Sequence, residues 1–226
     1  MKKLFLTVFS LTAFIASAQD FSFGIKAGAN FAAIGNSDEP LFDPADAFDL
    51  SELNFVSSSG GDNGGLTAIY FGVYAEIPVS ETFSIQPELL YSKQGGTQDG
   101  SLVFQEANVN YESTFNLSYL TVPIMAKFYV AKGLSLEAGP QIGFLLKSEV
   151  DIEVNANALF VSQSESTTKD VKDFTKSNDF AFNIGAGYQL NSGLNFNLRY
   201  NIGLTDAYED IDAKNSVFQV GVGYTF

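Results

Sequence analysis

SVFQVGVGYTF, residues 216–226, closes the chain and decides its fold. One parity of this stretch holds Phe218, Val220, Val222, Tyr224 and Phe226. The other parity holds small or polar residues such as Gly221, Gly223 and Thr225. Successive side chains of a β-strand point to opposite faces, so the pattern predicts a strand with one apolar face and one small or polar face.

Seven earlier segments alternate with the same period of two. With the terminal stretch, the expected strands are residues 21–33, 66–79, 83–91, 117–130, 134–146, 179–190, 194–204 and 216–226. Each is close to or above the length that a tilted strand needs to cross a lipid bilayer.

The connections between these segments alternate in length. Three are tight turns at residues 80–82, 131–133 and 191–193, and four are long polar stretches at residues 34–65, 93–116, 147–178 and 206–214. Short turns on the periplasmic side and long loops outside are typical of outer-membrane barrels. The sequence therefore predicts an all-β fold, an eight-stranded antiparallel transmembrane β-barrel with four long extracellular loops and three short periplasmic turns.

A soluble eight-stranded barrel is the rival interpretation. Its apolar parity would face inward and its other parity would form a solvated surface. Here the second parity is mostly Gly, Ser, Asn and Gln, which suits the crowded interior of a narrow barrel better than a solvated surface. The terminal aromatics Tyr224 and Phe226 also match the closing-strand signal of outer-membrane barrels, and we expect them to act as a membrane-assembly signal.

Two aromatic girdles are expected where the apolar parity meets the two membrane interfaces. The periplasmic girdle would contain Phe21, Phe83, Phe128, Tyr188, Tyr224 and Phe226, and the outer girdle Phe31, Tyr91, Phe144 and Phe180. Pro87, Pro123 and Pro140 fall inside expected strands. Because proline cannot donate to a ladder and a closed barrel has no edge, we expect local β-bulges at these positions.

Composition excludes several classes of protein. The 226 residues contain no Cys and no His, which removes disulfides, thiolate metal sites and the commonest general base. The net charge of −14 opposes binding to nucleic acid. Lys2 and Lys3, an apolar run and a small-residue motif at residues 16–18 predict a secretory signal peptide over residues 1–18, with residues 19–226 forming the barrel domain.

Several motifs carry a family resemblance. They are QPELLYSKQG from Gln86, SYLTVPIMAKFYV from Ser118, LSLEAGPQIGFLL from Leu134, FSFGIKAGANFA near the mature start, and the terminal VGVGYTF. With these motifs the chain resembles the PorT-like outer-membrane β-barrels of Bacteroidota, over nearly the whole mature length. The resemblance implies an eight-stranded barrel in the outer membrane. It does not by itself imply a part in a secretion machine.

Six ionisable residues have inward parity: Lys26, Glu76, Glu88, Lys127, Glu137 and Arg199. Charges in a narrow interior must be paired or hydrated. We expect a balanced network of salt bridges that plugs the barrel, and a narrow or gated ion path is the alternative.

The first long connection is acidic. Asp43, Asp46, Asp49 and Glu52 recur at intervals of three, and hard divalent cations prefer such oxygen ligands. The run lacks the pattern of an EF-hand, so a solvated acidic loop is the preferred interpretation and a divalent cation site the weaker one. No other cofactor is expected.

The sequence thus predicts a non-enzymatic outer-membrane protein with a structural or surface-recognition role through its long acidic loops. Expected partners are outer-membrane lipid and lipopolysaccharide, the barrel-assembly machinery, and an envelope or surface protein. The alternative is a transport or secretion-accessory component.

Overall fold

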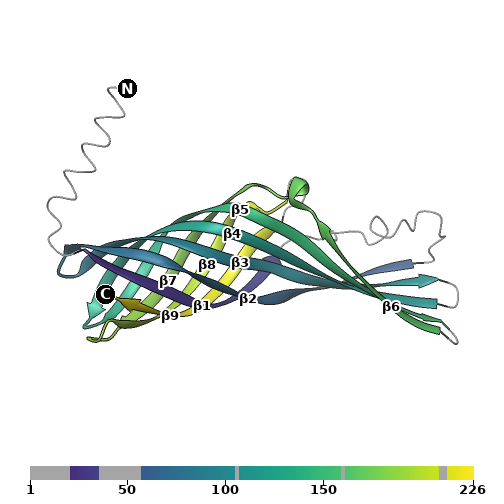
Figure 1. The fold of residues 1–226 in the computed structure, drawn as a ribbon, viewed down its shortest axis with the longest axis horizontal. Coiled ribbons are helices and arrows are strands. Elements are labelled where there is room, and N and C mark those ends of the chain that lie inside the picture. Colours follow the sequence, from purple (N-terminus) through teal and green to yellow (C-terminus); the bar gives the residue numbers. More distant parts are fainter. Residues whose placement is uncertain (1–20, 36–56, 105–106, 159–160, 209–212) are drawn as a thin grey trace, which may run out of the picture.

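The computed structural model describes residues 21–35, 57–104, 107–158, 161–208 and 213–226. Within these residues the elements are β1 Ser22–Gly35, β2 Ser57–Ser80, β3 Phe83–Phe104, β4 Ala107–Ala131, β5 Leu134–Ala158, β6 Val161–Asp170, the 3₁₀ helix η2 Lys172–Phe174, β7 Asn178–Gln189, β8 Leu194–Asp206 and β9 Lys214–Thr225 (Figure 1). Among the described residues no helix is long and apolar enough to cross a membrane. The expected signal peptide and the residues Asp43, Asp46, Asp49 and Glu52 lie outside the described ranges.

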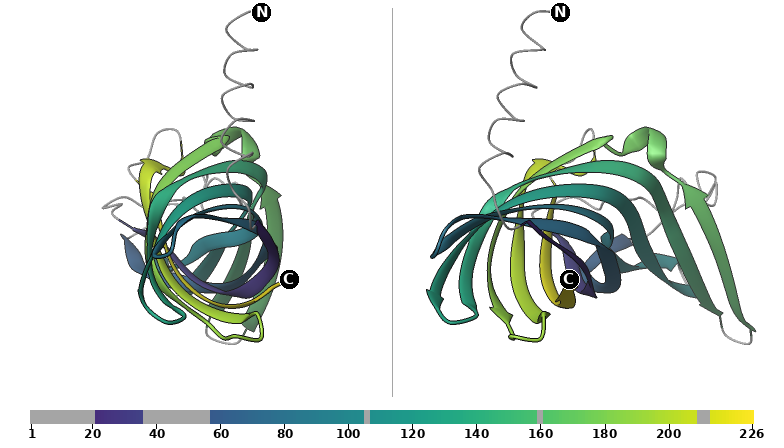
Figure 2. Two further views of the ribbon diagram at one scale, coloured as in Figure 1. Left: turned by 90° about the vertical axis from the view of Figure 1, so that its left-hand side faces the viewer. Right: turned by 60° about the vertical axis from the view of Figure 1, so that its left-hand side comes forward.

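The terminal strand closes the barrel. β9 pairs antiparallel with β1, from Gly24 opposite Thr225 to Gly35 opposite Lys214. Since β4 also pairs with β5, the strands β1 to β5 and β7 to β9 form a closed ring of eight. Figure 2 shows this ring in the view along the barrel. The predicted eight-stranded antiparallel barrel is confirmed.

Strands β2 to β5 continue beyond the barrel and form a second structure with β6. We call this structure the projecting sheet; it comprises residues 57–65, 94–104, 107–116, 147–158 and 161–170. β6 pairs with residues 149–158 of β5, and β7 pairs with residues 134–144 of the same strand. β6 therefore follows β7 along β5, beyond the barrel. Figure 1 shows the sheet extending to the right of the barrel.

The projecting sheet corrects the prediction for the long connections. The sequence predicts loops over residues 57–65, 93–116 and 147–178, whereas most of these positions are strand in the structure. These segments are rich in Ser, Thr, Asn and Asp and lack the apolar alternation by which the other strands were predicted. Such alternation is not required here, because the sheet does not face lipid. Backbone pairing between neighbouring strands holds the hairpins together instead.

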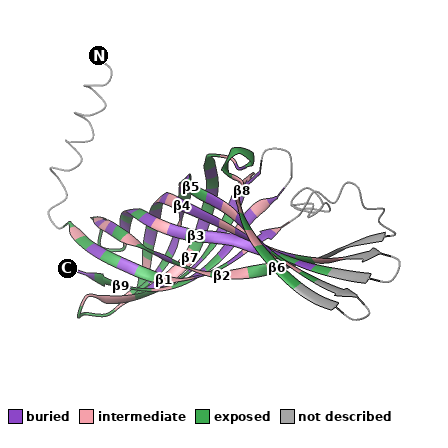
Figure 3. Cartoon of the chain, turned by 45° about the vertical axis from the view of Figure 1, so that its right-hand side comes forward, coloured by how far each residue is buried: buried purple, intermediate pink, exposed green. Residues whose placement is uncertain are grey.

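Apolar side chains cover the outside of the barrel, and polar side chains fill the inside. The alternation of buried and exposed residues is visible along the strands in Figure 3. Most of the expected girdle residues are exposed on the outer surface, and Phe83 and Tyr91 are half-buried. An outer surface of large exposed hydrophobics requires a lipid environment and excludes the soluble-barrel interpretation.

Tyrosines and glycines fit together inside the barrel. The Tyr70 side chain lies where a Cβ on Gly221 would stand, and the Tyr74 side chain does the same at Gly24. The Tyr70 hydroxyl donates a hydrogen bond of 2.7 Å to Oδ1 of Asn197, across the interior. Glycine on the inward parity therefore makes room for aromatic rings that cross a narrow barrel.

The three short turns lie at one end of the barrel, which we call the turn end. Gly133 and Gly193 have φ angles of 78° and 88°, in the left-handed region that glycine adopts without strain. The strands flanking these turns end or begin within a residue or two of the expected positions. The prediction of three tight turns is therefore confirmed.

The prediction of bulges at three prolines was wrong. Pro87, Pro123 and Pro140 each stay in register with one neighbouring strand, and on the other side the pairing lapses for two residues and then resumes without a shift. A missing N–H removes only one ladder bond, so the sheet tolerates it without an inserted residue. The β4–β5 pairing has two register shifts, and both lie elsewhere: one where Ser118 faces Lys147 and Tyr119 faces Leu145, and one between Tyr129 and Ala131 beside the turn.

Phe226 takes part in the contact between the last strand and the first, so its deletion tests the role of the closing strand. Its backbone N–H donates a hydrogen bond of 2.8 Å to the carbonyl oxygen of Phe23, and its ring contacts Tyr224 edge-on at 5.4 Å. We predict that deleting Phe226 lowers the membrane-assembled fraction several-fold, measured by heat-modifiable gel migration. The control is Phe196→Ser, which removes another lipid-facing aromatic from β8. Equal assembly of the deletion and the wild type would contradict an assembly role for the terminus.

Candidate functional site

The six inward charges form one continuous chain across the barrel interior. Their order is Lys26, Glu88, Arg199, Glu137, Lys127 and Glu76, so that the sign of the charge alternates at every step. All six residues are buried. The structure brings together every residue of the network that the sequence suggested.

Glu88 is the best-paired member of this chain. Nη1 of Arg199 lies 2.9 Å from one carboxylate oxygen of Glu88, and Nη2 lies 2.8 Å from the other. Nζ of Lys26 donates to the same carboxylate at 2.9 Å. A bidentate guanidinium–carboxylate pair is among the strongest charge-assisted hydrogen bonds in proteins.

In the second half of this chain of charges, the contacts of one carboxylate, that of Glu137, are longer. Glu137 lies 3.6 Å from Nη2 of Arg199 and 3.7 Å from Nζ of Lys127. Lys127 then lies 3.0 Å from Glu76. Glu137 therefore joins two tighter groups of ions.

Neutral side chains complete the hydrogen bonding of the carboxylates. Ser84 donates to Glu76 at 2.8 Å, and the hydroxyl of Tyr129 also donates to Glu76. Gln86 donates to Glu88 at 2.6 Å, and Ser135 donates to Glu137 at 3.1 Å. Buried ions of this kind are stable only when opposite charges and hydrogen bonds offset their desolvation.

Six of the eight barrel strands contribute to the charge chain. Its members come, in order along the chain of contacts, from β1, β3, β8, β5, β4 and β2. The Glu88–Arg199 pair joins residues 111 positions apart in the sequence. The chain of ions thus ties opposite walls of the barrel together near the turn end.

A layer of neutral polar side chains lies above the charges. Gln219 donates to Oδ1 of Asn30 at 2.8 Å, and Asn30 donates to Oγ of Ser92 at 2.9 Å. Asn201 donates to Oδ1 of Asn183 at 3.0 Å. These residues are buried, so amide groups span the barrel at this level.

An apolar cluster fills the barrel mouth under the projecting sheet. Its buried members are Ile34, Phe115, Leu117, Tyr119, Leu145, Val150, Ile152, Ala207, Tyr208 and Ala213. The rings of Phe115 and Tyr208 meet edge-on at 6.1 Å. Burial raises the pKa of Tyr208 above its ordinary value.

Sequence reasoning missed this apolar cluster because seven of its ten buried members fall in stretches that the sequence predicts as loops. The sequence did carry a signal for it. Phe115, Leu117 and Tyr119 alternate with the polar residues Asn116 and Ser118, and this alternation places the three apolar side chains on the inward face of β4. On β5 the bulge after Leu145 shifts the parity, which turns Val150 and Ile152 inward.

The three layers follow one another along the inward face of β1 as Lys26, Asn30 and Ile34. Beside the charges, the cavity lined by Lys26, Lys127 and Glu137 has a volume of only about 10 Å³. That is room for about one water molecule. A wider cavity of about 620 Å³ lies at the turn end, lined by Glu76, Tyr129 and the chain terminus. Among the described residues, no group of three or more carboxylates is arranged to hold a metal ion.

Comparisons with known proteins agree with a membrane barrel. A model of the outer membrane protein beta-barrel domain family matches residues 17–209. Similar solved structures include Ail, the attachment invasion locus protein of Yersinia pestis (14% identity, 92% of this chain and 100% of that chain covered, TM-score 0.40). Others are Neisserial surface protein A (9%, 92% and 100%, TM-score 0.46) and OprG of Pseudomonas aeruginosa (11%, 91% and 95%, TM-score 0.38). No curated protein matches the sequence.

Arg199 is the member of the charge chain whose loss should cost most. Arg199→Met leaves Glu88 and Glu137 underpaired in the interior, and we predict a loss of about 3–5 kcal/mol in the free energy of unfolding. The double variant Arg199→Met/Glu88→Gln should lose less free energy of unfolding than the sum of the losses in the two single variants, because it no longer contains the uncompensated carboxylate of Glu88. Urea unfolding in lipid vesicles measures all three variants, with the exposed Lys132→Met as control. Strict additivity would show that the two side chains are not coupled.

Proposed function

The chain belongs to the outer membrane protein beta-barrel domain family, and we propose that it is a non-enzymatic surface protein that acts through its projecting sheet. The turn end then faces the periplasm and the projecting sheet faces the outside of the cell. The role is recognition of a polar partner at the cell surface.

The filled interior is the observation that carries this proposal. Ions, amides and apolar side chains occupy successive levels of the barrel, and the cavity beside the ions holds about 10 Å³. Such an interior opposes free diffusion of solutes, whereas the sheet beyond the barrel offers surface for contact. The function is therefore assigned to the outside of the molecule.

The projecting sheet offers a polar recognition surface. Asp99, Glu112 and Glu153 lie directly opposite one another on β3, β4 and β5, and all three are exposed. Like charges in opposed positions destabilise a sheet, so stability alone does not account for this row.

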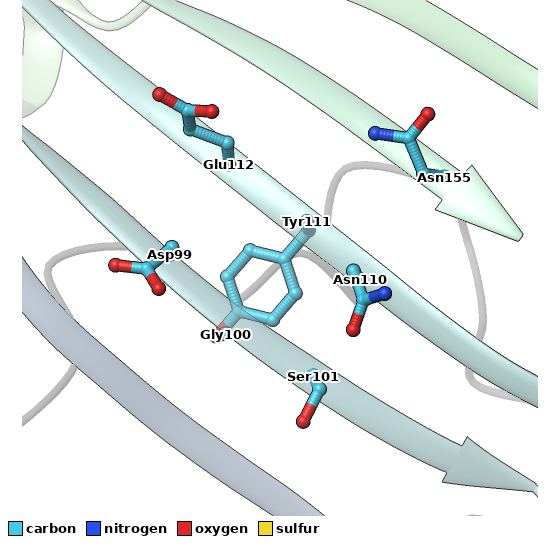
Figure 4. A pocket seen from close by; sticks show the side chains of 7 residues that line it. All are labelled: Asp99, Gly100, Ser101, Asn110, Tyr111, Glu112 and Asn155. Atoms are coloured by element: carbon cyan, nitrogen blue, oxygen red, sulfur yellow. The ribbon is translucent and has the colours of Figure 1, made fainter.

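A cavity of about 370 Å³ lies next to this acidic row (Figure 4). It is lined by Asp99, Gly100, Ser101, Asn110, Tyr111, Glu112 and Asn155. In Figure 4 the Tyr111 ring lies over Gly100, and the carboxylates of Asp99 and Glu112 and the amide of Asn110 extend from adjacent positions of β3 and β4. Hydroxyl, amide and carboxylate groups on these strands suit a partner rich in hydrogen-bonding groups.

A transport or secretion-accessory role, as the PorT-like resemblance suggests, is the second candidate. The cavity of about 620 Å³ at the turn end favours it, because a periplasmic partner would meet the barrel there. The acidic residues Asp43, Asp46, Asp49 and Glu52 remain a weaker candidate for a divalent cation. Outer-membrane lipid and the barrel-assembly machinery are partners that residence in this membrane implies.

We predict that the purified protein shows no channel activity in planar lipid bilayers at high salt. The ionic chain and the apolar cluster close the path at two separate levels. A steady open-channel current carried by the wild-type protein would contradict the closed interior and support solute passage.

Site-specific crosslinking on intact cells separates the two candidate functions. A photo-crosslinking residue in place of Asn110 reports on the projecting sheet, and one in place of Lys132 reports on a periplasmic turn. We predict partner adducts from position 110. Adducts from position 132 alone would favour the accessory role.

The chain contains no Cys, so Glu112→Cys gives a clean location control. A membrane-impermeant maleimide should label this variant on whole cells and leave Lys132→Cys unlabelled. The reverse result would invert the orientation on which the proposal depends.

A further inference from the structure

The outward face of β3, β4 and β5 is stratified in composition. At the upper edge of the apolar belt stand Leu89, Tyr91, Leu120, Phe144 and Leu146. The next level carries Lys93, Ser118 and Lys147, and the levels above carry carboxylates. The two lysines therefore stand where lipid-facing surface gives way to the projecting sheet.

Lys93 and Lys147 are neighbours across one intervening strand. Each is directly opposite Ser118, Lys93 on β3 and Lys147 on β5. Two strand spacings separate their backbones by roughly 10 Å. Ser118 is buried beneath the hydroxyl of Tyr91, which donates to its Oγ at 3.1 Å. Between the two lysines the surface is therefore formed by the small residue Ser118, and Tyr91 lies beside it at the edge of the apolar belt.

A bulge directs Lys147 outward. The β4–β5 register shifts between Ser118 and Tyr119, so that Leu146 and Lys147 are both exposed although they are adjacent in the chain. Bulges re-aim side chains in this way. Regular alternation after Leu146 would have turned the Lys147 side chain into the barrel. The backbone is therefore built to present this ammonium group at the membrane edge.

Lys172 brings a third ammonium group to the same place. Its Nζ donates to the carbonyl oxygen of Leu146 at 3.1 Å, next to Lys147. An ammonium group has three donors, so others remain available. Lys147 is paired with Glu149 at 2.7 Å, and its side chain is still 61% exposed. Asp170 and Asp173 flank Lys172 on its own segment.

We propose that Lys93, Lys147 and Lys172 bind the phosphate groups of an anionic glycolipid in the outer leaflet. Phosphates of such a lipid lie directly above its acyl chains, and these lysines lie directly above the apolar belt. The proposal rests on placement in the outer membrane and is independent of the recognition role of the projecting sheet.

The surrounding charges favour a lipid over a soluble anion. The chain as a whole carries a net charge of −14, and Asp151, Glu112 and Asp99 lie above the lysines on the same face. These carboxylates repel an anion that approaches from the solvent. A phosphate that is presented from the membrane reaches the lysines from below, beside Tyr91, while its acyl chains contact the belt.

The test uses the purified full-length protein and native mass spectrometry with a bisphosphorylated lipid A. The variant Lys93→Gln/Lys147→Gln/Lys172→Gln should weaken binding roughly a hundredfold, from the contribution of each lysine near an anionic lipid surface. Lys132→Gln, at the opposite end of the barrel, should bind like the wild type. Replacing the three lysines with arginine should preserve binding.

Three results would overturn the proposal. They are unchanged lipid binding by the triple Gln variant, equal binding of dephosphorylated lipid A by the wild type, and displacement of the lipid by millimolar inorganic phosphate. The last result would identify a site for free anions. Heat-modifiable migration checks that the triple variant is folded. If it is not, Lys93→Gln and Lys147→Gln are measured singly, each with an expected loss of roughly fivefold, and no loss in either would also overturn the proposal.

Discussion

The structure depends on one constraint, that every backbone N–H and C=O group inside a lipid bilayer must be paired within the protein. A sheet satisfies this constraint only when its first and last strands meet. The pairing of β1 with β9 supplies that contact from Gly24 to Gly35 of β1, and it leaves no open edge within the belt. The outer face must then be apolar. Eight strands enclose so narrow a space that its contents are largely determined by what fits.

That narrow interior explains the layers found inside. Six residues of alternating sign form a neutral set there by sharing carboxylates, with Glu88 held by both Lys26 and Arg199. Tyrosine rings occupy the space that glycines leave free, as with Tyr70 and Gly221. Nearer the outside, the apolar cluster around Phe115 and Tyr208 removes the need for paired polar groups. A barrel filled in this way supports contact at its surface better than passage through its middle.

Much of the barrel could be predicted from sequence because lipid on one side and a polar interior on the other impose a strict period of two. The six inward charges followed from parity alone, and the structure joins them in a single chain. The projecting sheet could not be predicted in the same way, since outside the lipid neither face of a strand must be apolar. The bulge at Lys147 was also missed, because the inserted residue leaves no mark in composition. At Pro87, Pro123 and Pro140 the error was physical: a missing donor interrupts one ladder without moving the register.

The central claim is that the interior of the barrel is sealed, and a buried cysteine tests it most directly. Ser92 lies in the amide layer, is almost fully buried, and differs from Cys by a single atom. In the folded Ser92→Cys variant, a small cationic thiol reagent should leave the cysteine unmodified until the barrel is unfolded. Modification as fast as that of Ser101→Cys on the projecting sheet would show an open, water-accessible interior and would contradict the account.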